Sequence, residues 1–254
     1  IKNRLPQIRE IAMHFAGVDP GRQRITKQQT VHYPMGGIDV NVKTEAPISG
    51  IYSAGECSCV SVHGANRLGG NSLLETVVFG VRAGMEALKF YQQNKLQNFS
   101  KNSLKDEQNR LTSLMERTKG EKAAPIRGDM EKTMINSFGI FRNKKLMQQG
   151  FDNILELKKR FENVIVDDKG KTYNLDLIRV LELENMLDIA HIVAVGAIPR
   201  EESRGAHFRE DFPEMNNKKF LKHTIVQRDD NGEAQLSYKD VVIEDIEPLS
   251  EIKY

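Results

Sequence analysis

The sequence predicts a fold of the α+β class, in which short extended segments lie on either side of a central helical region. A strand-like segment over residues 50–55 runs through a glycine-rich loop into a helix that begins near Ser72. Stripes of apolar residues at helical spacing then occupy much of the chain between residues 104 and 195. Near the end, Asn231-Gly232 separates two extended segments, a pattern that favours a β-hairpin.

The first predicted element is a short helix over residues 4–16, whose apolar residues fall on one face and which Gly17 can end. An extended segment, Gln29–Tyr33, follows and runs into Gly36-Gly37. Glycines after a histidine allow a tight turn, which would direct the imidazole of His32 toward the interior of the loop. A histidine in a strand is also commonly an ordinary core or surface residue, so the local pattern alone leaves the role of His32 open.

The central unit is a strand, a loop and a helix. Ser72 and Glu75 have the spacing of a capping box, and six later apolar residues fall on one helical face. Gly69-Gly70-Asn71 lets the backbone approach a ligand closely, and the first amides of a helix favour negative charge. These features predict a site for an anionic, polar ligand. The helix also carries Gly80 and Gly84, for which we expect close packing against a sheet.

A polar stretch over 94–103 predicts a domain boundary, beyond which the pattern becomes that of a small helical bundle. A fourth helix, over about 175–195, is apolar nearly all round at its end and is expected to be deeply buried. The remaining predicted elements are helical stripes at Leu104/Leu111/Leu114/Met115, Ile126/Met130/Met134/Phe138/Phe141 and Met147/Gly150/Ile154/Leu157/Phe161, a strand at Val164–Val166, and hairpin strands at Phe220–Gln227 and Ala234–Ile243 around Asp230-Asn231-Gly232.

Composition excludes some classes of function. The chain has 254 residues and a formal net charge of +2, and it contains no apolar run near the ~18 residues of a membrane span. Nucleic acid and bare membrane are therefore not expected as partners. The two cysteines, Cys57 and Cys59, are too close for an unstrained disulfide and too few for a metal cage, so we expect them to be small packing residues and predict no metal site.

Three motifs together carry a family resemblance. The stretch from Glu56 to Glu75, with Val-Ser-Val-His-Gly-Ala-Asn-Arg-Leu-Gly-Gly-Asn-Ser-Leu-Leu-Glu at its end, resembles the C-terminal flavin-binding segment of the succinate dehydrogenase/fumarate reductase flavoprotein subunit. His32–Ile38, with His-Tyr-Pro-Met-Gly-Gly-Ile, and Glu202–Pro213, with Glu-Ser-Arg-Gly-Ala-His, agree with it in the same order. Three motifs spread over most of the chain make a specific match.

The resemblance implies a domain organisation and a cofactor. It implies the end of a capping domain over 1–28, the C-terminal part of an FAD-binding α/β domain over 29–95, a helical bundle over 96–195 and a β-hairpin tail over 196–254. The cofactor would be FAD. Because these residues contain no Gly-x-Gly-x-x-Gly loop, we expect that loop to lie upstream, together with the family's proton-donor arginine. No catalytic residue is therefore predicted in this segment.

The resemblance also implies roles for five residues. Glu56 would hold a ribose hydroxyl of FAD, and the backbone amides of Ser72 and Leu73 would meet the pyrimidine edge of the flavin. Arg67 would bind a substrate carboxylate with its planar guanidinium, and His32 would assist at a carboxylate. Without the resemblance, Glu56 reads as a surface or capping residue and Arg67 as half of an ion pair. The motif around Arg204 and His207 is expected to pack the tail against the flavin domain, with no chemistry assigned.

The implied reaction is hydride transfer between flavin N5 and a carbon of succinate or fumarate, coupled to a respiratory chain. The implied partners are an iron-sulfur subunit and membrane anchor subunits, which would hold the protein at the inner face of the cytoplasmic membrane, with the periplasmic face as the alternative. An L-aspartate oxidase is an alternative, although that family usually has Met-Ala-Ser-Asn-Ser where this chain has Leu68–Ser72. A second alternative is a non-catalytic interaction fragment, in which Arg67 and Glu56 make structural ion pairs.

Overall fold

The computed structural model describes residues 4–24, 32–95, 100–229 and 231–248, which divide into two compact units, residues 1–34 and 35–254. The first unit contains helix α1 (Pro6–Ala16), which begins with Pro6 in its first turn and ends at Gly17, as expected. Of the predicted strand Gln29–Tyr33, residues 29–31 lie outside the described residues, and His32 and Tyr33 are not in a strand.

The second unit opens with β1 (Ile38–Asp39), which pairs in parallel with β2 (Ser58–Cys59). The strand predicted over 50–55 is reduced to one isolated bridge, between Glu45 and Tyr52. Two glycines with positive φ, at the two ends of that segment, turn the chain away from a longer ladder. Val40, Ala46 and Val60 form a small core with Phe79 beneath these strands.

Helix α2 (Asn71–Gln93) begins where the sequence predicted, but the predicted capping box is wrong. Its N-cap is Gly70, with φ 86°, and no side chain caps the helix. Glu75 is 3% exposed and turns inward instead of folding back toward Ser72. The predicted apolar face is 49–63% exposed, so within the described part of the chain nothing covers it; its members are Leu74, Val77, Val78, Val81, Met85 and Leu88.

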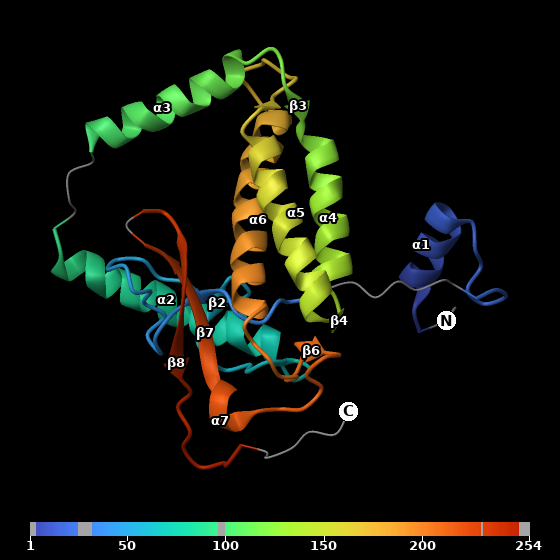
Figure 1. Ribbon diagram of the computed structural model, residues 1–254, viewed down its shortest axis with the longest axis vertical. Coiled ribbons are helices and arrows are strands. Elements are labelled where there is room, and N and C mark those ends of the chain that lie inside the picture. The colour runs from blue at the N-terminus through green and yellow to red at the C-terminus, as the bar shows by residue number, and fades with distance from the viewer. Residues whose placement is uncertain (1–3, 25–31, 96–99, 230, 249–254) are drawn as a thin grey trace. The chain divides into compact units, whose positions relative to one another are not determined.

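Helices α4, α5 and α6 lie side by side as a bundle (Figure 1). Helix α3 begins inside the predicted polar boundary, with Ser100 as its N-cap. Phe141, predicted to be helical, lies in a strand because α4 ends at Phe138. The bounds are α3 Lys101–Glu116, β3 Glu121–Lys122, α4 Ala123–Phe138, β4 Phe141–Arg142, α5 Lys144–Phe161, β5 Val164–Ile165, α6 Leu175–Ala197 and β6 Phe208–Arg209.

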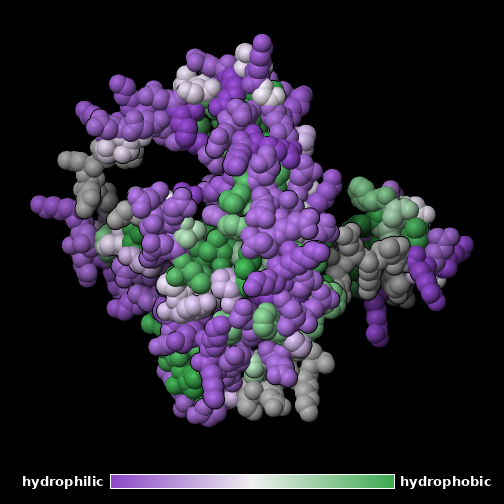
Figure 2. Space-filling model, viewed as in Figure 1, coloured by the Kyte–Doolittle hydropathy of each residue, from purple (hydrophilic) through white to green (hydrophobic). Residues whose placement is uncertain are grey.

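The main core lies between these helices and includes Ile126, Met147, Ile154, Val180 and Leu183, each at most 1% exposed. The end of α6 corrects the sequence prediction. It buries small residues, Ala190, Ala194 and Ala197, and exposes Ile189, Ile192 and Val193. On the face seen in Figure 2 the bundle is mostly hydrophilic, and hydrophobic residues gather near the junction of α6 with the tail.

The tail contains α7 (Asn217–Phe220), β7 (Lys222–Arg228) and β8 (Ala234–Asp240). The two strands form an antiparallel hairpin in the position that the Asn-Gly signal indicated. Asp230 lies outside the described residues, but Asp229 N–H donates to Glu233 O at 2.9 Å and closes the turn. None of the helices in the described ranges is long and apolar enough to cross a membrane.

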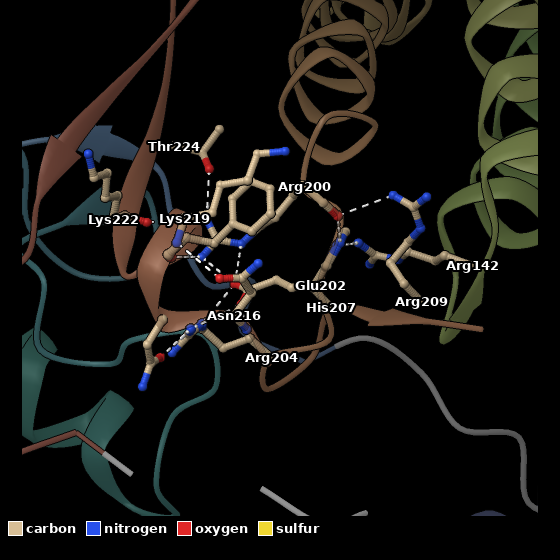
Figure 3. A network of polar contacts seen from close by, with 12 residues as sticks. Arg142, Arg200, Glu202, Arg204, His207, Arg209, Asn216, Lys219, Lys222 and Thr224 are labelled. Carbon is tan, nitrogen blue, oxygen red and sulfur yellow. Dashed lines mark hydrogen bonds and ion pairs between the residues drawn. The ribbon is translucent and has the colours of Figure 1, made fainter. Parts of the chain in front are cut away.

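A buried polar network holds the start of the tail (Figure 3). Glu202, with 0% exposure, accepts hydrogen bonds from Arg200 Nε at 3.0 Å and from Arg204 Nε at 2.8 Å. The backbone N–H of Asn216 donates to its second oxygen at 2.8 Å. Burial opposes ionisation of Glu202, but the bonds from Arg204 and Asn216 outweigh it and lower its pKa. The carboxylate is therefore charged and compensated inside the fold.

A second part of this network ties the tail to the bundle. The guanidinium of Arg209, also fully buried, makes a two-pronged pair with Asp211 at 2.7 and 2.8 Å. Asp211 in turn accepts from the backbone N–H of Lys144 at the start of α5. His207 donates from Nε2 to Arg200 O at 3.0 Å and accepts at Nδ1 from Arg142 at 2.9 Å. These bonds require the neutral imidazole.

We expect Gly150→Ala to destabilise the bundle by about 1–3 kcal/mol, because a Cβ at this position in α5 would lie 2.4 Å from Ser137 Cβ in α4. Gly128→Ala, in α4 with no atom within 4 Å of the added Cβ, is the matched control and should stabilise by up to about 1 kcal/mol. Denaturant unfolding of each variant measures both effects, and equal effects of the two changes would contradict this packing.

We also expect His207 to make stability depend on pH. Burial, with the nearby arginines, lowers the pKa of His207 to about 4, whereas its ordinary value is 6.5. Between these two values the unfolded chain binds a proton that the folded chain excludes. Neutral His207 therefore contributes about 3 kcal/mol at most to the free energy of unfolding, and this contribution is lost as pH falls from 6.5 to about 4. His207→Asn should flatten the unfolding free energy across this range, whereas His14→Asn, at an exposed position of α1, should leave the slope unchanged. A wild-type slope in His207→Asn would refute the assignment.

Candidate functional site

Two of the motifs meet where Gly37 of the first contacts Cys57 of the second. Gly37 has φ 125°, and a Cβ there would lie 2.5 Å from the carbonyl oxygen of Cys57. Only glycine satisfies both conditions. Ile38 N–H then donates to the same oxygen at 2.9 Å, which begins the pairing of β1 with β2. The Gly-Gly of the first motif thus fixes the backbone at the start of the second.

Glu56 lies at an exposed turn that leads into β2, rather than at the end of a preceding strand as expected. The turn is closed by Ser58 N–H, which donates to Gly55 O at 2.9 Å, and by the Ser58 hydroxyl, which donates to the same oxygen at 3.0 Å. These bonds hold the turn from its buried side. The carboxylate of Glu56 is left at the surface, where a ligand hydroxyl can reach it.

Arg67 lies half-buried in the loop between β2 and α2, close to the start of the helix. The loop is held to α2 by His63, whose Nε2 donates to Glu75 Oε2 at 2.7 Å. The side chain of Glu75 is 1% exposed, and its other oxygen lies 3.5 Å from the hydroxyl of Ser58. Helix α2 and the loop are therefore joined by a buried pair just ahead of Arg67.

The sequence pattern predicts a capping role for Glu75 and no role for His63, so it does not indicate this pair. The signal that could have found them is the pairing of a histidine in the loop with a carboxylate one turn into the helix. Such a pair, when buried, fixes a loop against a helix.

Ser72 and Leu73 lie in the first turn of α2, as predicted, with Ser72 half-buried and Leu73 71% exposed. The first four N–H groups of a helix have no partner within the helix, and here the N-cap is a glycine without a side chain to accept from them. A Cβ on Gly69 or Gly70 would meet no atom within 4 Å. This arrangement fits the acceptor edge of a flat heterocycle such as a flavin.

His32 belongs to the first unit and is exposed there. Its role as a helper at a substrate carboxylate stays a prediction. Cys57 is exposed and Cys59 half-buried, and both are free thiols. Burial raises the pKa of Cys59, which disfavours a reactive thiolate. In the described ranges, no group of three His, Cys, Asp or Glu side chains could hold a metal ion.

The third motif packs against this loop. Ala206 N–H donates to Ala65 O at 3.0 Å, and Gly205 lies against the same residue. From β7, His223 Nε2 is hydrogen-bonded to the hydroxyl of Ser61 at 2.8 Å. Residues of the tail therefore contact the loop that carries Arg67, although they follow it by well over a hundred positions. The contact of Ala206 agrees with the packing that the resemblance implied for this motif, whereas no sequence pattern indicated the contact of His223.

Two family models match the chain. The model described as "Fumarate reductase flavoprotein C-term" covers residues 127–254, which is half of the chain, and the model described as "FAD binding domain" covers residues 1–73. The second match contains Glu56, Arg67 and the first three residues of α2, and it confirms the expectation of FAD.

Individual relatives and a solved structure agree with the two family models. The fumarate reductase flavoprotein subunit of Serratia sp. (strain ATCC 39006) is 41% identical over 99% of this chain and 43% of its own length. The succinate dehydrogenase flavoprotein subunit of Rickettsia bellii (strain RML369-C) is 37% identical over 96% of this chain and 43% of its own length. The structure entitled "Quinol-Fumarate Reductase with Menaquinol Molecules" has a TM-score of 0.91 at 40% identity, over 98% of this chain and 44% of that one.

The chain thus spans less than half of the length of the curated relatives that it matches. The motifs His32–Ile38 and Glu202–Pro213 lie within the regions that the family models match, and the motif Glu56–Glu75 does so as far as Leu73. The α+β arrangement of an FAD-binding segment and a helical C-terminal domain agrees with the solved structure. The resemblance predicted from the motifs is confirmed, and the chain belongs to the fumarate reductase/succinate dehydrogenase flavoprotein family.

Proposed function

We propose that this chain forms part of a flavoprotein subunit that interconverts succinate and fumarate. The observation that carries the proposal is the placement of Arg67, half-buried in a loop that leads directly into the uncapped N-terminus of α2. Such a loop sets a carboxylate-binding side chain beside a helix terminus suited to a flavin. Flavin N5 accepts or supplies the hydride when FAD is bound.

Arg67 would orient the substrate. Its guanidinium can donate two parallel hydrogen bonds to one carboxylate, and this geometry fixes the carboxylate plane as well as its position. Because transfer needs the reacting carbon in line with its acceptor, holding one end of a small dicarboxylate removes much of the orientational freedom of the substrate. The cation also stabilises negative charge that develops on the dicarboxylate. His32 would assist at a carboxylate.

The start of α2 and Glu56 would hold the cofactor. The backbone amides of Ser72 and Leu73 would donate to the pyrimidine edge of the flavin, where the positive end of the helix dipole favours negative charge on the reduced ring. Glu56 would accept from a ribose hydroxyl of FAD. The exposure of Glu56 and the lack of a side-chain cap at Gly70 support these roles, because both leave polar groups available to a ligand.

The domain boundaries near residues 28, 95 and 195 remain part of this proposal. We infer that an iron-sulfur subunit and membrane anchor subunits are the partners, and that the subunit lies peripherally at the inner face of the cytoplasmic membrane. The quinol-fumarate reductase named above supports a respiratory assembly of this kind. The relatives are named fumarate reductase or succinate dehydrogenase subunits, which favours these activities over that of an L-aspartate oxidase.

We expect Glu56→Ala in the full-length protein to weaken FAD retention, since a ribose hydroxyl would lose a charged acceptor worth about 1.5–3 kcal/mol. The measurement is flavin content per polypeptide after dialysis. Glu162→Ala, an exposed carboxylate just after α5, is the control and should retain the wild-type content. Unchanged flavin in Glu56→Ala would return this residue to an ordinary surface role.

We expect Arg67→Lys in the full-length enzyme to keep FAD but lose most succinate–fumarate turnover. Lysine keeps the charge but cannot make the planar, two-pronged contact. If Arg67 acts mainly in the transition state, kcat falls together with kcat/KM, whereas a higher KM alone would indicate uniform binding. His32→Ala should act in the same direction more weakly, and the two changes should not add, because they touch one ligand.

The control for this experiment is Arg127→Lys, at an exposed ion pair with Glu131 on α4, which should leave turnover unchanged. Wild-type turnover in Arg67→Lys, with flavin content confirmed, would assign Arg67 to the scaffold and remove the basis of the proposed substrate.

A further inference from the structure

The loop that carries Arg67, residues 61–67, contains neither helix nor strand. Its shape therefore depends on what it contacts. Alternate residues of the loop are held by three separate elements: Ser61 by β7, His63 by α2 and Ala65 by the turn of residues 204–207. Two of these three contacts come from the C-terminal tail.

The contact with the turn is the tightest. A Cβ on Gly205 would lie 2.5 Å from both the carbonyl carbon and the carbonyl oxygen of Ala65, which no real side chain tolerates. Gly205 also has φ 57°, at the first central position of a two-residue turn. The neighbouring N–H of Ala206 donates to that carbonyl at 3.0 Å. Backbone thus meets backbone, two residues before Arg67.

The turn itself is rigidly supported. Arg204 and His207 exchange two backbone hydrogen bonds, of 2.8 and 3.0 Å, across it. Their side chains belong to the network of Figure 3, Arg204 through Glu202 and His207 through Arg142 and the Arg200 carbonyl. A turn fixed at both ends is suited to hold a loop in one position.

The hairpin supplies a second hold. His223 on β7 reaches the Ser61 hydroxyl at 2.8 Å, and Lys239 on β8 pairs with both oxygens of Asp39, at 2.9 and 3.0 Å. Asp39 is in β1, which pairs with β2 immediately ahead of the loop. The hairpin therefore fixes the N-terminal side of the loop, and the turn fixes the side nearer to Arg67.

We propose that the tail is a positioning device for Arg67, in which Gly205 and His223 hold the loop 61–67 where its arginine meets a substrate carboxylate. This inference rests on the proposed function, since it requires that Arg67 bind substrate. Gly205 and His223 act only through the loop and are positioning residues. A shift of about 1 Å in a group that orients substrate can cost about 100-fold in rate.

The test is Gly205→Ala in the full-length, flavin-loaded enzyme. The added Cβ must push the Ala65 carbonyl away, so kcat/KM for fumarate should fall about 100-fold, with kcat included, while FAD content stays at the wild-type level. Gly17→Ala, outside the tail, is the matched control. Gly17 has a similar positive φ, 65°, but a Cβ there meets no atom within 4 Å, and the kinetics of the variant should be those of the wild type.

A kinetic cycle with Arg67→Lys shows whether Gly205 acts through the arginine. In that background Gly205→Ala should lower kcat/KM by less than about threefold, because the contact that it misplaces is already lost. An equal loss in both backgrounds would overturn the inference. Wild-type turnover in Arg67→Lys would overturn the proposed function. An inactive Arg67→Lys together with wild-type kinetics in Gly205→Ala would overturn only the positioning role of the tail.

Because Gly205→Ala could prevent folding, Ser61→Ala provides a second test. It removes only the hydroxyl that binds His223, and we expect a fall in kcat/KM of about three- to tenfold with FAD content unchanged. Thr112→Ala, which deletes an exposed hydroxyl bonded to Gln108 O on α3, is the control and should have no effect. Wild-type kinetics in Ser61→Ala, with Gly205→Ala either normal or unfolded, would reject the positioning role.

Discussion

The second unit depends on one buried carboxylate. Glu202 compensates Arg200 and Arg204 inside the protein, and the loop at Asn216 closes over it through a backbone N–H. Removing one member of such a buried pair commonly costs about 3–5 kcal/mol, because the remaining charge is left uncompensated. Since Arg200 also donates to Thr224 on β7, the same carboxylate indirectly aligns the hairpin. Turn and hairpin thus share a single electrostatic centre.

The parts of the fold that could be predicted from the sequence are those set by local chemistry. The apolar period of 3.6 residues located α4, α5 and α6, and an asparagine or serine that can cap a helix stands at the start of α3, α5 and α6. The glycine-rich loop indicated where α2 begins. Each of these signals lies within a few residues of the structure that it forms, so neither partners far along the chain nor burial had to be known.

The remainder depends on contacts that no local pattern encodes. Glu75 has the spacing of a capping residue, but a half-buried histidine competes for it more strongly than the helix end does. The segment 50–55 has strand-forming residues, yet only Tyr52 pairs. Of the candidate site, Arg67, Ser72 and Leu73 could be located because they belong to a motif. The motif around Gly205 was expected to pack against the flavin domain, but its contact with Ala65 was not located, and the contact of His223 had no signal because the whole bundle lies between it and the loop in the sequence.

The hydrogen bond between Ser61 and His223 joins residues 162 positions apart. During synthesis at roughly 5–20 residues per second, the loop therefore waits about 8–30 s before its last contact leaves the ribosome. Of the three contacts described above, only the one from α2 can form before the tail is synthesised; the turn of residues 204–207 follows, and His223 comes last. The entropic cost of closing so long a segment is offset only when the tail docks. The substrate-binding loop is thus completed late in folding, and a chain cut short within the tail would retain its helices while lacking an ordered site.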